Sequence, residues 1–278
     1  MTFTGADDIT VVADRRGDPE APPVVFLHGG GQTRHSWGGT ATAVAERGWC
    51  AWTVDLRGHG ETDWAPAADY RLTKFAADVA EVLAAIGDRP TLVGASLGGL
   101  TSLLLLGRDA PGVARGLVLV DIVPHMEKTG ADRIQAFMAA NARTGFASLE
   151  EAAEAVAAYN HHRERPPSVD GLRKNLRERE GRWYWHWDPD FIDPDRTSGP
   201  SEIQDAELLM GCARAIEEPK LLVRGRMSDV VSHAGAQHFL EHVPGTDYVD
   251  VSEAGHMVAG DRNDAFTDAV AGFLDSLD

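Results

Sequence analysis

The chain has 278 residues, which is long for one simple domain but usual for a single α/β domain that carries an insertion. Its 26 Lys and Arg stand against 43 Asp and Glu, a formal net charge of −17, which argues against nucleic acid or an anionic membrane as a partner. Two cysteines cannot build a disulfide framework, and neither a signal peptide nor a run of roughly 20 apolar residues is present, so we expect a cytoplasmic protein.

The first part of the chain alternates short apolar runs with helical patterns, as parallel α/β sheets do. The expected strands are residues 9–13, 24–27, 50–54, 91–93 and 116–121. The expected helices between them are residues 37–47, 74–86 and a segment after residue 96. This order predicts a mostly parallel central sheet with helices on both faces.

The pattern changes between residues 125 and 215, where no buried-strand run occurs. Three amphipathic helical patterns are expected there, around Ile134, around Ala155, and through Leu172 and Leu176. We interpret residues 125–215 as a mainly helical cap inserted into a discontinuous core of residues 1–124 and 216–278. Strands at 220–225 and 248–251 and a closing helix through Phe266 complete that core.

The stretch Thr-Leu-Val-Gly-Ala-Ser-Leu-Gly-Gly at residues 91–99 predicts a strand, an abrupt turn and a helix, with Ser96 at the turn. Gly94 and Gly98 supply the small side chains that such a turn needs, because a larger one would collide with the neighbouring backbone. The turn would expose the Ser96 hydroxyl above the sheet at the N-terminus of a helix, which favours a nucleophile. A glycine-rich turn with an incidental serine is the alternative.

A second glycine-rich stretch, His28-Gly29-Gly30-Gly31, follows the buried run at 24–27. Consecutive glycines let backbone N–H groups approach a ligand closely, which suits an oxyanion hole or a phosphate cradle. Because no Gly-Lys-Ser/Thr follows, the phosphate reading is disfavoured. The charged loop at residues 55–60 is interpreted as loop architecture rather than as catalytic.

A serine nucleophile needs a base and a carboxylate that orients the base. Ser96, Asp229 and His256 each follow an expected parallel strand and come in the order nucleophile, acid, histidine. Asp121 also ends a buried strand and is the alternative acid. We favour Asp229 and expect Asp121 to anchor the connection to the cap.

These motifs, His28-Gly29-Gly30, Gly94 to Gly98, Gly225 to Asp229 and Gly255-His256, resemble the motif set of the α/β-hydrolase superfamily over the whole core. The resemblance implies that Ser96 is the nucleophile, His256 the general base and Asp229 its orienting acid. It also implies an oxyanion hole formed by the N–H groups of Gly30 and Leu97. Cap-bearing epoxide hydrolases and haloalkane dehalogenases are similar too, but they use an aspartate where this chain has Ser96.

The sequence therefore predicts a serine carboxylic ester hydrolase that acts on a small-molecule ester, needs no cofactor and binds neither nucleic acid nor membrane. Lactonase, thioesterase, carbon–carbon bond hydrolase and perhydrolase activities use the same triad and stay open. The alternative from another class of protein is a ligand receptor that keeps the hydrolase fold. Burst kinetics on an activated ester distinguish them, because an enzyme turns over after the burst whereas a receptor stalls or does not react. The sequence leaves the oligomeric state open.

Two further patterns concern binding. Trp183, Trp185 and Trp187 alternate, so an extended backbone would place all three indoles on one side, either as a pocket wall or as packing between cap and core. The segment from His238 to His242 matches an inverted zinc-peptidase pattern, His-x-x-Glu-His. We reject a metal site there because the apolar residues of that helix would turn both histidines toward solvent and no third ligand is identifiable.

Overall fold

The computed structural model describes residues 1–159, 169–193, 205–261 and 263–277. Its central sheet has eight strands in the order β1-β2-β4-β3-β5-β6-β9-β10, and all neighbouring pairs from β4 to β10 are parallel, whereas β1 and β2 pair antiparallel at one edge. The strands are β1 (Thr2–Thr4), β2 (Thr10–Arg16), β3 (Pro23–Leu27), β4 (Cys50–Val54), β5 (Thr91–Ala95), β6 (Gly116–Val120), β9 (Lys220–Gly225) and β10 (Thr246–Val251). The predicted mostly parallel α/β sheet is confirmed.

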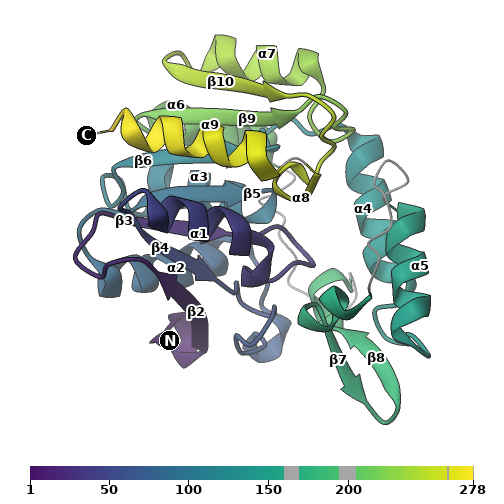
Figure 1. Cartoon of the computed structure of the whole chain (residues 1–278). Coiled ribbons are helices and arrows are strands. Elements are labelled where there is room, and N and C mark those ends of the chain that lie inside the picture. The colour runs from purple at the N-terminus through teal and green to yellow at the C-terminus, as the bar shows by residue number, and fades with distance from the viewer. Residues whose placement is uncertain (160–168, 194–204, 262, 278) are drawn as a thin grey trace.

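Helices cover both faces of this sheet (Figure 1). One face packs against α1 (Gly38–Glu46) and α9 (Asn263–Asp275), with the short α8 (Val258–Asp261) beside them. The other face packs against α2 (Leu72–Ile86), α3 (Leu97–Leu104), α6 (Ala206–Ala215) and α7 (His233–His242). The strands that lie between the two helix layers, such as β3, β5 and β6, are buried almost throughout, which explains their continuous apolar runs.

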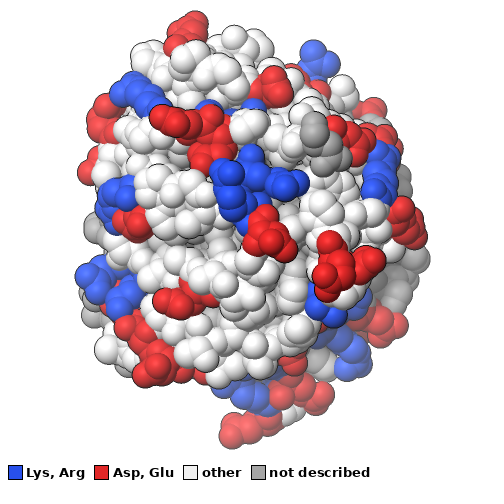
Figure 2. All heavy atoms as spheres, turned by 90° about the vertical axis from the view of Figure 1, so that its left-hand side faces the viewer, with Lys and Arg blue, Asp and Glu red and all other residues white. Residues whose placement is uncertain are grey.

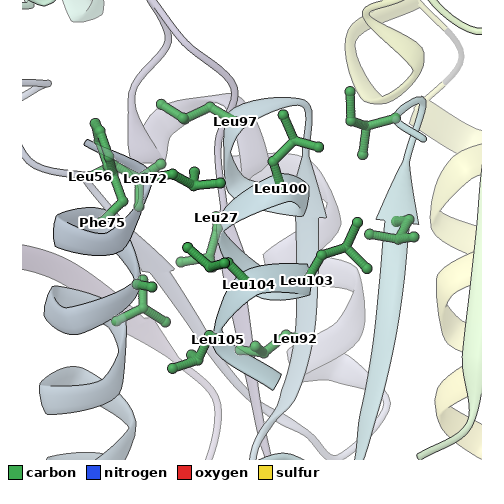
Figure 3. Packing of buried hydrophobic residues seen from close by; sticks show 14 of the residues in the cluster. Leu27, Leu56, Leu72, Phe75, Leu92, Leu97, Leu100, Leu103, Leu104 and Leu105 are labelled. Atoms are coloured by element: carbon green, nitrogen blue, oxygen red, sulfur yellow. The ribbon is translucent and has the colours of Figure 1, made fainter. Parts of the chain in front are cut away.

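Helix α3 runs through the middle of the core and is buried along its whole length. Leu100, Leu103 and Leu104 of this helix are buried in the core, with Leu104 on the side of Leu72 and Phe75 of α2 and the other two on the opposite side (Figure 3). A helix that is apolar all round is stable only in such a buried place. The segment that follows α3 packs against α6 so closely that a Cβ at Gly107 would lie 2.2 Å from the carbonyl oxygen of Cys212. Helix α6 therefore packs with the core helices, although it lies within the residues 125–215 that the sequence analysis interprets as the cap.

The cap lies over the carboxyl ends of the parallel strands (Figure 1). It contains α4 (Lys128–Ala140), α5 (Leu149–Tyr159) and a two-stranded antiparallel hairpin of β7 (Leu176–Arg179) and β8 (Arg182–Trp185). The predicted helix through Leu172 and Leu176 is wrong, because a short helical turn at Asp170–Lys174 leads directly into β7. Glu180 and Gly181 both have positive φ, 53° and 74°, as a two-residue hairpin turn of the I′ type requires.

Charged side chains of both signs are interspersed on the face that points away from the cap (Figure 2). Acidic and basic groups alternate there with uncharged surface, so on this face the excess of acidic residues does not gather into one patch. Across the described ranges, no helix combines the length and the apolar character that crossing a bilayer would need.

Candidate active site

Ser96 lies at the abrupt turn between β5 and α3, with φ 46° and ψ −113°. This conformation is costly for a residue with a side chain and is kept only where the surrounding structure enforces it. Gly94 and Gly98 allow it: a Cβ at Gly94 would lie 2.6 Å from the carbonyl carbon of Gly98, and a Cβ at Gly98 would lie 2.4 Å from the carbonyl oxygen of Leu27. The turn therefore has the shape of a nucleophile elbow.

The carboxylate beside His256 is that of Asp121, whose Oδ2 lies 2.7 Å from His256 Nδ1. Asp121 is fully buried, and its oxygens also accept the N–H of Gly225 at 2.9 Å and the hydroxyl of Ser228 at 2.5 Å. All three partners are donors, so the site suits a carboxylate that acts only as an acceptor. Because a carboxylate can only accept, Nδ1 of His256 is the donor in this contact, and Nε2 is the ring nitrogen left for another partner.

The strand order explains how His256 reaches Asp121. Asp121 follows β6, which pairs with β5 on one side and with β9 on the other, whereas His256 follows β10 at the edge. The loop that carries His256 must therefore cross the end of β9. It does so at Gly225, where a Cβ would lie 2.1 Å from the carbonyl oxygen of Gly255. A glycine at the end of β9 lets the histidine loop lie directly on it.

The structure brings Asp121, and not the predicted acid Asp229, to His256. Its carboxylate points to the cap, where Oδ2 lies 2.9 Å from Nε of Arg133 on α4, and its side chain is 38% exposed. The Asp229 backbone packs against Gly130 of α4, where a Cβ would lie 2.2 Å from the Asp229 carbonyl oxygen. The two aspartates have thus exchanged the places we predicted: Asp121 contacts the histidine, and Asp229 contacts the cap.

Ser96 and His256 open into one cavity of about 410 Å³ between the sheet and the cap. Gly30 and Leu97 also line it, so the residues predicted for the nucleophile, the base and the oxyanion hole come together. Apolar side chains form most of the remaining wall, and none of its described residues is Lys, Arg, Asp or Glu. They include Leu100, Met126, Ile134, Phe137, Met138, Val156, Leu172, Phe191 and Ile192.

Two of the three predicted tryptophans, Trp185 and Trp187, line this cavity and are nearly fully buried. Trp183 is not among the lining residues. Its ring lies 4.8 Å beneath the guanidinium of Arg173, and its backbone pairs with Phe146. The chain leaves the strand geometry of β8 after Trp185, so Trp187 reaches the cavity from a different segment than the hairpin.

The glycine loop after β3 is held by side chains on both sides of Gly30. Gly29 N–H donates to Oε1 of Gln32 at 3.1 Å, and Gly31 N–H donates to Nε2 of His59 at 3.0 Å. Leu97 N–H is the first of α3 and has no acceptor within the helix. These contacts leave the N–H groups of Gly30 and Leu97 as the two candidate donors to an oxygen bound at Ser96.

His28 and His59 are both fully buried behind this loop. Burial and, to a smaller extent, the neighbouring His28 ring together lower the pKa of His59 to about 3. Burial also lowers the pKa of His28, although the carboxylate of Asp55 acts in the opposite direction. Both imidazoles are therefore neutral in the folded protein, whereas in the unfolded chain they protonate near pH 6.5.

We expect these histidines to make the protein less stable in mild acid. Below about pH 6.5 the unfolded chain binds protons that the folded chain does not, so the free energy of unfolding falls as the pH decreases toward 3. Between pH 7.5 and 5.5 the loss should be about 1 kcal/mol for each buried neutral imidazole. Urea unfolding at the two pH values measures it, and His59→Gln should lose less stability over this range than the parent. An equal loss of unfolding free energy in the parent and in His59→Gln would contradict the assignment of His59 as a buried neutral imidazole.

The histidines of α7 lie on its exposed face, as the amphipathic pattern predicted. His238 and His242 are exposed, while Ala236, Phe239 and Val243 are buried. Among the residues that the structure describes, no group of three or more His, Cys, Asp or Glu is arranged to hold a metal ion.

The sheet order, the elbow and the glycine loop together define the α/β-hydrolase class of fold. Residues 22–262 match the family described as the alpha/beta hydrolase fold, so the chain belongs to this family, and the resemblance inferred from its motifs is confirmed.

Relatives and solved structures agree with this assignment. The chain is 32% identical to an esterase of Mycobacterium tuberculosis (Rv0045c) over 92% of this chain and 84% of that protein. It is 30% identical to an sn-1-specific diacylglycerol lipase of Mus musculus over 93% of this chain and 82% of that one. The crystal structure of E-2-(acetamidomethylene)succinate hydrolase superposes with a TM-score of 0.83 over 99% of both chains at 22% identity, which shows the shared fold.

Proposed function

We propose that this protein is a carboxylic ester hydrolase that acts on neutral, apolar esters through an acyl-enzyme. Ser96 is the nucleophile, His256 the general base and Asp121 the acid that orients it. The observation that carries the proposal is the buried Asp121–His256 pair, 2.7 Å apart, at a cavity into which the strained Ser96 turn also opens. The two relatives named as an esterase and a lipase support ester hydrolysis.

The first half of the reaction forms the acyl-enzyme. Ser96 Oγ attacks the ester carbonyl carbon and gives its proton to His256 Nε2. Asp121 keeps the Nδ1 proton of His256 in place and stabilises the imidazolium. The carbonyl oxygen becomes an oxyanion that accepts the N–H groups of Gly30 and Leu97. The carbon–oxygen bond then breaks, and His256 gives its proton to the leaving alkoxide, which departs as the alcohol.

The second half returns the enzyme to its starting state. Water attacks the acyl carbon and gives a proton to His256, and the same two N–H groups stabilise the second oxyanion. The bond to Ser96 Oγ breaks, Oγ takes the proton back, and the carboxylic acid leaves. No cofactor is needed for these steps.

The cavity wall supplies the argument for a neutral substrate. Phe137 on α4 stacks on Tyr159 of α5 with ring centroids 4.3 Å apart, and Trp185 of β8 lies edge-on to Phe137 at 5.8 Å. A carboxylate brought against this part of the wall would lose its hydration, and the described lining residues offer it no Lys or Arg as a partner, which costs several kcal/mol. An apolar acyl chain instead gains about 25 cal/mol for each Å² that it buries.

A pair of esters with one leaving group tests both parts of the proposal. 4-Nitrophenyl hexanoate and the mono-4-nitrophenyl ester of adipic acid have similar acyl chains but differ in a terminal carboxylate. We expect the enzyme to hydrolyse the hexanoate with a burst followed by turnover, and the adipate at least about 100-fold less efficiently in kcat/KM. Equal efficiency on both would contradict the neutral pocket, whereas no turnover of either, or a burst without turnover, would contradict the esterase itself.

A further inference from the structure

The loop at residues 55–60, interpreted from the sequence as structural, carries a histidine that contacts the oxyanion loop directly. This loop follows β4, and β4 pairs with β3, so it lies next to the glycine loop that follows β3. His59 is fully buried in it. Its Nε2 lies 3.0 Å from the N–H of Gly31, and its Nδ1 lies 2.9 Å from the carbonyl oxygen of Arg57.

The two contacts define the protonation state of His59. A backbone N–H can only donate, so Nε2 must be the acceptor, and Nδ1 carries the hydrogen that it donates to the Arg57 carbonyl. Arg57 is itself fixed, because its guanidinium binds both carboxylate oxygens of the buried Asp78 at 2.6 and 2.8 Å. The imidazole is therefore a neutral acceptor on a rigid support.

The cap contacts the same histidine loop. The His59 backbone pairs with Trp187, Gly60 N–H donates to the His186 carbonyl at 2.7 Å, and Asp188 N–H donates to the Gly58 carbonyl at 2.8 Å. The His59 ring also lies edge-on to Phe191, with centroids 5.0 Å apart. Phe191 in turn reaches within 3.5 Å of the place where a Cβ of Gly30 would lie. His59 thus joins the cap to the loop that carries the candidate oxyanion donor.

We propose that His59 is a positioning residue: by accepting the Gly31 N–H, it fixes the glycine loop so that the adjacent Gly30 N–H points at the oxyanion. This inference rests on the proposed ester hydrolysis. Since Gln32 holds Gly29 on the other side, loss of the His59 acceptor releases the anchor at Gly31. The oxyanion forms only along the reaction path, so the loss should affect kcat and leave substrate binding nearly unchanged.

The test compares three variants on a neutral 4-nitrophenyl ester. His59→Leu removes the acceptor and keeps an apolar side chain in the site, whereas His59→Gln retains an oxygen acceptor near the place of Nε2. Thr62→Val is the matched control in the same loop: the buried Thr62 hydroxyl accepts Val12 N–H at 2.9 Å and donates to the Asp55 carbonyl at 2.7 Å, away from the glycine loop. It should lower Tm with kcat unchanged.

For His59→Leu we expect kcat to fall about 10- to 100-fold with KM within about threefold, because a misaligned oxyanion donor costs less than the loss of a donor. His59→Gln should recover most of kcat. Inactivation by an alkyl phosphonate fluoridate, whose P–O group occupies the same donors, should slow in parallel with kcat.

Three results would overturn the positioning role while the parent enzyme still turns over esters. They are kcat of His59→Leu equal to that of Thr62→Val, a rise in KM that accounts for the whole loss, or His59→Gln no better than His59→Leu. If His59→Leu does not fold, kcat and KM of His59→Gln are compared with those of the parent instead. A loss in kcat with KM unchanged then supports the positioning role, and a loss that lies wholly in KM contradicts it. A parent that hydrolyses no ester contradicts the proposed function instead.

Discussion

Replacing Ser96 by alanine should leave the fold intact and lower kcat on an activated ester by about 10⁴- to 10⁶-fold. The hydroxyl is the nucleophile that forms the acyl-enzyme in the proposed mechanism, and the glycines around it, not the hydroxyl, make the strained turn sterically feasible. Residual activity would come from the oxyanion donors and from substrate binding. Steady-state kinetics measure the loss, and an unchanged Tm checks the fold.

A labelling experiment supplies the control for this variant. An alkyl phosphonate fluoridate should modify the parent enzyme at Ser96 and leave Ser96→Ala unmodified. Ser102→Ala is the matched control on the same helix, since the buried Ser102 hydroxyl only donates back to the Gly98 carbonyl at 2.8 Å, and this variant should be labelled like the parent. Mass-spectrometric detection of the label on another residue would contradict the assignment of the nucleophile.

The second large effect is expected for Asp121→Asn, which should lower kcat by about 10⁴, as the same change does in chymotrypsin-type triads. An asparagine oxygen can satisfy only some of the three donors now held by Asp121, and its amide would present N–H to His256 and favour the wrong tautomer. The imidazole would then no longer offer an unprotonated Nε2 to Ser96. Measurement of kcat and of its pH dependence on folded Asp121→Asn protein tests this expected loss.

Asp229→Asn is the matched control, because it changes an aspartate that also follows a parallel strand. Its ion pair with Arg133 is more than a third exposed on both sides, and such pairs contribute between about 0 and 1 kcal/mol. We expect kcat to change by no more than a fewfold. If Asp229→Asn proved the crippling variant and Asp121→Asn the mild one, Asp121 would not be the acid.

The pattern of apolar runs was enough to predict the sheet and Ser96. A strand that is buried on both faces is apolar whichever strands lie beside it, and the elbow needs glycines on both sides of the serine. Both features can therefore be recognised from a short stretch of sequence. Gly94 and Gly98 meet this requirement in the structure. The same holds for α7, whose exposed histidines follow from helical periodicity alone.

The choice of acid could not be made locally, because Asp121 and Asp229 each follow a buried parallel strand. What decides between them is the path of the His256 loop over Gly225 and the approach of α4 to Asp229, and both depend on segments far apart in the chain. The sequence did contain one signal in favour of Asp121: it directly follows β6, the strand that pairs with β5, at whose end Ser96 lies. The contact between the 55–60 loop and the glycine loop was missed for the same reason, since His59 accepts a backbone N–H that lies 28 residues away in the chain.

The position of Asp121, the proposed acid, directly after β6 has a consequence for recombination with other members of the fold. Ser96 and Asp121 both precede the cap in the chain, and only His256 follows it, so a foreign insertion joined after Asp121 and before α6 would inherit an acid that is already seated on the Gly225 and Ser228 donors. The contacts to match would be the exposed pair of Asp229 with Arg133, which contributes little to stability, and the backbone contacts of residues 186–188 with the loop at residues 58–60. Substrate preference could then be transplanted with the cap as one cassette, without rebuilding the carboxylate behind the histidine.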